Sequence, residues 1–132
     1  NLILQNYWSY VPDDYNHIIF CTSAKPFQKD YSCKLFEKFL YNLSPECKSI
    51  SLVSAFGAGE SIKEGNLGIQ IMDRFYLKDV YASKNNQETL LNSYNKNVKK
   101  YIYRPRALSF GKTRLSSKSR KDLAQEMLKV IL

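Results

Sequence analysis

The sequence predicts a small α/β domain, and three observations support that fold class. The chain has 132 residues, which is the usual size of one compact domain. Its composition is globular, with 44% hydrophobic and 24% charged residues. Two short apolar runs flank a segment with helical periodicity. We therefore expect a mixed or parallel sheet of three to five strands with helices packed on it, followed by a basic C-terminal extension that ends in an amphipathic helix.

The centre of the predicted domain is a strand, helix, strand unit. Residues 17–22 form a continuous apolar run of the kind found in strands that are buried on both faces. Asp30 or Ser32 can cap a helix that ends before Pro45. The apolar residues of this helix recur on one face, and they are Leu35, Phe36, Phe39, Leu40 and Leu43. Residues 50–56 form the second strand, so a parallel crossover is expected.

The segments around this unit have weaker patterns. Residues 1–15 contain an apolar cluster that fits a strand or a short helix, and glycines punctuate a loop from Gly57 to Gly68. Residues 67–72 and 75–81 have β-type composition. The polar stretch 82–87 is interpreted as a surface loop. Residues 88–100 predict a helix with Leu90, Leu91, Tyr94 and Val98 on one face, broken by the Arg-Pro-Arg sequence at 104–106.

The end of the chain predicts an amphipathic helix. Ser119 can cap it, and Asp122 stands at the third position of that helix, which is the pattern of a capping box. The preceding stretch, residues 111–118, is expected to be flexible. One helical stripe carries the apolar residues Leu123, Met127, Leu128 and Ile131. This stripe is a candidate contact for a protein partner.

Charge is distributed very unevenly along the chain, whose formal net charge is +8. Residues 1–95 hold nine basic and ten acidic side chains, whereas residues 96–132 hold eleven basic and two acidic ones. No acidic residue occurs between Lys96 and Lys121. A segment of this kind repels itself, so it needs a solvated surface or an anionic partner. We therefore divide the chain into a near-neutral α/β core, 1–95, and a basic C-terminal extension, 96–132.

The basic extension predicts a binding function, with nucleic acid as the first candidate partner and anionic lipid as the second. Lysine and arginine neutralise phosphates, and aromatic rings stack on unpaired bases. A solvated basic surface with Tyr101 and Tyr103 in the core is the alternative. The predicted nucleic-acid-binding residues are Lys99, Lys100, Tyr101, Tyr103, Arg104, Arg106, Lys112, Arg114, Lys118, Arg120 and Lys121.

Several kinds of chemistry lack a sequence signature, so no cofactor, metal or catalytic residue is predicted. The three cysteines, Cys21, Cys33 and Cys47, are too far apart for a zinc motif, and an odd number leaves one without a disulfide partner. We interpret them as reduced, mostly buried thiols of an intracellular protein, either nuclear or cytoplasmic. The glycine segment that begins at Gly57 lacks the spacing of a phosphate-binding loop. No apolar run is long enough to span a membrane.

A different function class would draw on carboxylates in the middle of the chain. Glu60, Glu64, Asp73 and Asp79 could serve a metal-dependent nuclease, although their spacing matches no motif. The first residue is Asn1 and not methionine, so we also expect the chain to be part of a longer protein, with any catalytic half outside it.

One stretch resembles a known family. The resemblance is found in Val11-Pro12, in residues 17–24, and in residues 29–32 with the helix through Leu43. These segments resemble the start of the small subunit of caspase-type cysteine peptidases. Residues 69–81 are similar to its closing strand region, so the resemblance covers 11–81. It implies a subunit or pseudo-enzyme fragment that acts through protein contacts, since the catalytic His and Cys of the family belong to the other subunit. The family's aromatic-Ser-Trp-Arg element, which grips an acidic substrate residue, has no counterpart between Pro26 and Lys29.

Overall fold

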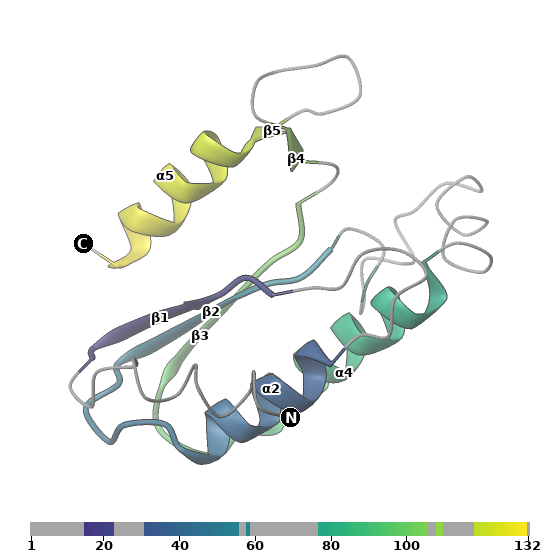
Figure 1. Cartoon of the computed structure of the whole chain (residues 1–132). Coiled ribbons are helices and arrows are strands. Elements are labelled where there is room, and N and C mark those ends of the chain that lie inside the picture. The colour runs from purple at the N-terminus through teal and green to yellow at the C-terminus, as the bar shows by residue number, and fades with distance from the viewer. Residues whose placement is uncertain are drawn as a thin grey trace.

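The protein contains a three-stranded parallel sheet with two helices on one side (Figure 1). The structure is a computed structural model, and it describes residues 15–22, 31–55, 58, 77–105, 108–109 and 118–131. Its elements in chain order are β1 (His17–Phe20), α2 (Ser32–Tyr41), β2 (Ser49–Val53), α4 (Lys78–Ser93), β3 (Lys99–Tyr103), β4 (Leu108–Ser109), β5 (Lys118–Ser119) and α5 (Arg120–Ile131). The predicted small α/β fold is therefore confirmed.

Several predicted segments lie outside the described residues. They are the opening apolar cluster at 1–14, most of the glycine-punctuated loop, the strand expected at 67–72 and the stretch 111–117.

The sheet has the order β1-β2-β3, and both pairings are parallel. His17 lies opposite Ser49, which in turn lies opposite Lys99. The central strand β2 is buried over Ser49–Leu52, as expected for a strand with a neighbour on each side. Since β3 begins at Lys99, the sheet continues past residue 95, where the sequence places the boundary between core and extension.

The hydrophobic core lies between the sheet and α2 with α4. Phe36, Phe39 and Leu40 of α2 are buried, and the ring of Phe36 lies 4.6 Å from that of Phe20 on β1. Ile50 and Leu52 of β2 are completely buried beneath them. Burying side chains of this size stabilises the fold by about 1.5–3 kcal/mol each. The periodicity of residues 35–43 thus correctly predicts which face of the helix is inside.

The start of α2 differs from the expected cap. The helix begins at Ser32, after Tyr31, whose side chain forms no capping hydrogen bond. The other candidate cap, Asp30, lies outside the described residues. The Ser32 hydroxyl is buried and accepts a hydrogen bond from Gln87 Nε2 at 2.6 Å. The prediction that Ser32 caps this helix is therefore wrong, because its hydroxyl instead joins α2 to α4.

The helix α4 contradicts three sequence expectations. It runs from Lys78 to Ser93, so residues 78–81 are not a strand, 82–87 are not a surface loop, and the helix does not continue to 100. Ser83, Lys84 and Gln87 are buried. The buried polar residues of this segment pack through hydrogen bonds, which hydrophobic periodicity does not detect. Residues 99–103 form a strand instead, and this strand pairs with β2 in parallel.

The chain continues from β3 into a parallel two-stranded pair, β4 and β5, and then α5. In Figure 1, α5 lies on the side of the sheet away from α2 and α4. Its predicted capping box is confirmed: Ser119 N donates to Asp122 Oδ2 at 3.0 Å, and Asp122 N donates to Ser119 Oγ at 3.2 Å.

Candidate functional site

Strand β3 divides the predicted binding residues between the two faces of the sheet. Successive side chains of a strand point to opposite faces. Lys100 and Arg104 contact α4 and Ile102 packs against the hydrophobic core, so all three face the helices. Lys99, Tyr101 and Tyr103 therefore lie together on the second face of the sheet.

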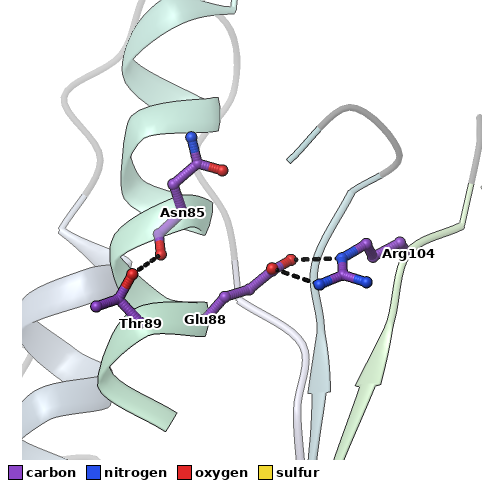
Figure 2. Close-up of polar contacts among 4 residues, drawn as sticks. All are labelled: Asn85, Glu88, Thr89 and Arg104. Carbon is purple, nitrogen blue, oxygen red and sulfur yellow. Dashed lines mark hydrogen bonds and ion pairs between the residues drawn. The ribbon is translucent and has the colours of Figure 1, made fainter. Parts of the chain in front are cut away.

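The two cations on the helix side have structural partners. The Lys100 ammonium donates to the carbonyl oxygens of Asn92, at 3.2 Å, and Tyr94, at 2.5 Å, just where α4 ends. Orphan carbonyls at a helix C-terminus attract cations. Arg104 forms a bidentate ion pair with Glu88, with distances of 3.1 Å from Nε to Oε1 and 2.8 Å from Nη2 to Oε2 (Figure 2). The sequence assigns both cations to phosphate binding, whereas here they join β3 to α4.

The second face of the sheet is only partly covered. Lys99 is exposed, and Tyr101 and Tyr103 are half-buried. Across the register, Tyr101 lies in line with Ser51 and Ile19, and Ile19 is 39% exposed. The small Ser51 is fully buried, and its hydroxyl has no hydrogen-bond partner. This arrangement places two phenol rings and an ammonium group side by side along one strand.

A row of polar residues lies at one end of this face. His17 and Lys99 are the outer members of the row, with Ser49 between them. The Nδ1 atom of His17 lies 2.7 Å from Ser49 Oγ. His17 is thus a strand-end residue with a satisfied hydrogen bond, in line with its position just ahead of an apolar run.

The described part of the structure does not place the remaining predicted binding residues on this face. Arg106, Lys112 and Arg114 lie outside the described residues, as does the side chain of Lys118. Arg120 and Lys121 are exposed in the first turn of α5.

A groove of about 510 Å³ lies between α4 and β3. One wall comes from residues of α4 that share a helix face, and the other from the helix side of β3. Its lining residues are Asn85, Glu88, Thr89, Asn92, Lys100, Ile102 and Arg104. Figure 2 shows the Glu88–Arg104 pair together with Thr89, whose hydroxyl donates to the Asn85 carbonyl oxygen at 3.0 Å. The sequence pattern does not predict this groove, because it places Asn85 in a loop and Lys100 at the end of a helix instead of in a strand.

A buried polar cluster connects the carboxyl ends of β1 and β2 to α4. The Lys84 ammonium donates to the carbonyl oxygens of Thr22, at 2.6 Å, and Val53, at 3.0 Å. Lys84 is only 4% exposed, so these hydrogen bonds offset part of the cost of burying its charge. No sequence signal identified Lys84, because the sequence of a polar stretch does not show whether its lysine is buried or exposed to solvent.

The thiols and carboxylates supply no assembled reactive centre in the described part of the chain. All three cysteines are free, and only Cys47 is buried, so the expectation of mostly buried thiols holds for one of them. Burial raises the pKa of the Cys47 and Cys21 thiols, and the nearby Lys84 ammonium partly offsets the rise at Cys21. Of the carboxylates proposed for a nuclease, Asp79 is exposed in the first turn of α4, and Glu60, Glu64 and Asp73 lie outside the described residues.

Half of the apolar stripe of α5 is buried inside the fold. Leu123 and Met127 are 6% and 3% exposed, whereas Leu128 is 48% exposed and Ile131 is half-buried. Two of the four residues predicted to contact a protein partner are thus already covered by this chain. Among the described helices, none has both the length and the apolar character needed to cross a membrane.

Comparison with known proteins identifies no relative: no family model, curated protein or solved structure matches the chain. The resemblance of residues 11–81 to the caspase small subunit stays a prediction, as does an intracellular location.

Proposed function

We propose that this chain binds single-stranded nucleic acid on the second face of its sheet, with the basic residues beyond β3 contributing further phosphate contacts. The observation that carries the proposal is the alignment of Lys99, Tyr101 and Tyr103 on one face of β3. Their even spacing places consecutive side chains roughly 6.6 Å apart. Each tyrosine ring can then stack on one unpaired base while the lysine pairs with the backbone.

The charge of the whole chain supports this choice of partner. The net charge is +8, and the cations are concentrated in residues 96–132. This concentration of positive charge favours binding of a polyanion, because each phosphate that a cation neutralises releases counterions. Single strands are favoured over duplexes, since aromatic stacking needs bases that are not already stacked in a helix.

The first test is the binding of a fluorescent oligothymidylate and an oligouridylate over a salt series from about 50 to 200 mM. We expect Tyr101→Leu and Tyr103→Leu each to weaken binding by about 1–3 kcal/mol, the usual worth of one stacked base. Lys99→Gln should lower the slope of log affinity against log salt by about 0.7, the contribution of one phosphate on a single strand.

The matched control is Lys34→Gln. Lys34 is exposed on α2, which packs on the helix side of the sheet, so this change removes the same charge away from the proposed surface. An equal loss in Lys34→Gln would mean that only net charge matters, and unchanged affinity in both tyrosine variants would contradict the proposal. Circular dichroism of each variant checks that the fold is retained.

A second experiment separates the sheet face from the cations that follow it. A combined Arg106→Gln, Lys112→Gln and Arg114→Gln variant should lower the salt slope by about two, because three phosphate contacts of about 0.7 each are lost. If the slope stays the same, the segment after β3 does not contact the nucleic acid. Binding to vesicles of anionic lipid, but to neither oligonucleotide, would assign the basic surface to a membrane instead.

A further inference from the structure

The outer edge of β3 presents backbone groups that no described residue pairs. In the order β1-β2-β3, β3 has a neighbour on one side only among the described strands. Lys99 N donates to Lys48 O at 3.0 Å, and Tyr103 O accepts from Ser54 N at 2.8 Å. Since hydrogen bonding to one side alternates along a parallel strand, the backbone groups of Lys100 and Ile102 point away from β2.

This edge, which no described strand covers, coincides with the groove between β3 and α4. Lys100 and Ile102 line the groove on the strand side, and Asn85 and Asn92 mark its extent along α4. Seven helical residues advance roughly 10 Å, which is the length of about three residues of extended chain. The groove therefore has the length and the hydrogen-bonding edge that a short added strand requires.

The charges of the groove indicate what kind of strand fits. Glu88, its one carboxylate, is already in a bidentate ion pair with Arg104. The Lys100 ammonium has two neutral carbonyl partners, Asn92 O and Tyr94 O, and no described carboxylate faces it. The groove thus keeps a net positive charge, which attracts an acidic side chain.

A second copy of the same chain fits this edge less well. Pairing two β3 edges would place two strands next to each other that each carry Lys99 and Lys100 and no carboxylate. Like charges on adjacent strands destabilise their pairing. Lysines on an edge strand are a common means of preventing this self-association.

We propose that the edge of β3 is a peptide-binding site, which takes an extended, acidic segment of a partner protein as an additional strand. The backbone of that segment pairs with Lys100 and Ile102, and its acidic side chain lies near Lys100. Thr89 and the asparagines of α4 contact its other side chains. This site lies on the opposite side of β3 from the proposed nucleic-acid face and does not depend on it.

The test is selection from a display library of random short peptides against the whole chain. We expect enrichment of peptides that combine β-branched residues with Asp or Glu. Thr89→Trp places a large ring in the groove from an exposed helix position, and it should weaken binding of the selected peptides by about tenfold or more. Asn86→Trp is the matched control, because Asn86 is exposed on α4 but does not line the groove.

Two further measurements separate strand addition from other modes of binding. Methylation of alternate backbone amides in a selected peptide should abolish its affinity, whereas methylation of the intervening amides should not. Thr89→Trp should leave oligonucleotide binding unchanged, so failure of one site is distinguishable from failure of the other.

Three outcomes would overturn the proposal. One is the absence of any enriched peptide. Another is that selected peptides bind equally well to the Thr89→Trp and Asn86→Trp variants. The third is sedimentation of the chain as a dimer that Thr89→Trp dissociates, which would assign the edge to a second copy.

Discussion

Glu88 is the one carboxylate that is buried among the described residues, with 3% of its surface exposed. A buried carboxylate is costly unless it is paired and hydrogen-bonded. Arg104 meets this requirement with two parallel N–H to oxygen contacts, which is the strongest geometry for such a pair. The arginine that sequence patterning assigns to a phosphate is therefore tied to α4.

This pair makes a prediction for a double-mutant cycle. Arg104→Met leaves Glu88 buried without a partner, so it should lower the free energy of unfolding by about 3 kcal/mol, the low end for a buried pair, since Arg104 itself is 29% exposed. The double variant, Glu88→Met with Arg104→Met, should lose clearly less than Arg104→Met alone. Urea denaturation measures both. Strictly additive losses would show that the two side chains do not stabilise each other.

Polar residues also limit what can be inferred at the residue scale. Gln87 is fully buried, and its amide donates to Ser32 Oγ at 2.6 Å from a neighbouring helix. Sequence alone predicts glutamine and lysine at the surface, because these types are rarely buried. Only a partner that is 55 positions away in the sequence makes burial favourable, and a local pattern contains no information about that partner.

At the scale of elements, the terminal helix α5 is the best predicted. Its capping box has the expected residues, and the Ser119 hydroxyl also donates to Asp122 Oδ2 at 2.8 Å. These contacts satisfy backbone donors that the first helical turn would leave unpaired. The signal is reliable because capping depends on residues that are adjacent in the chain.

The cap makes a stability prediction. Ser119→Ala should lower the free energy of unfolding by about 1 kcal/mol, the usual value for losing an N-cap, and Ser119→Thr should restore most of it. Ser93→Ala is the control, because the exposed Ser93 hydroxyl only donates to Leu90 O at the end of α4 and its loss should cost less than about 0.5 kcal/mol. Thermal and chemical denaturation report both values. Equal effects at the two serines would contradict a capping role.

The helix α4, in contrast to α5, is poorly predicted by its local sequence. Its segment 84–87 consists of Lys, Asn, Asn and Gln, and asparagine is more common in loops and caps than in helix interiors. The segment is nevertheless helical, because Lys84 hydrogen-bonds to Thr22, just after β1, and to β2, and Gln87 hydrogen-bonds to α2. Tertiary hydrogen bonds therefore override a weak local preference.

For the whole molecule, the charge boundary and the structural boundary differ. The basic excess begins after Asn95, whereas the sheet needs β3, residues 99–103. Ile102 of β3 packs against the same core as Phe36 and Leu91. A cut at residue 95 would consequently remove one edge of the sheet and not just an appended basic segment.

This difference predicts how truncated chains behave. A chain that ends at Asn95 should lose cooperative unfolding, because β2 would be left with an unpaired edge and the core would lose one wall. A chain that ends at Pro105 retains all three strands and should still unfold cooperatively. Thermal unfolding followed by circular dichroism compares the two. A cooperative transition in the shorter chain would show that β3 is not needed for folding.

The candidate site follows the same division between local and tertiary information. Charge counting correctly identified a basic segment that includes Lys99, but it treated all of its cations alike. Strand alternation separates Lys99 from Lys100, and this separation depends on residues 99–103 forming a strand rather than the end of a helix. The groove beside β3 was not predictable, because the sequence pattern misses the first half of α4 and continues its helix through Lys100 instead of starting β3.

The sequence by itself determined the α/β class, the strand, helix, strand unit of β1, α2 and β2, and the capped terminal helix. Each of these depends on periodicity or on neighbouring residues, so the information is local. The tertiary structure alone decided that α4 begins at Lys78 and ends at Ser93, that β3 completes the sheet, and that Lys100 and Arg104 hold these two elements together. Those outcomes depend on hydrogen bonds and ion pairs between distant segments, whose energies exist only once the chain is folded.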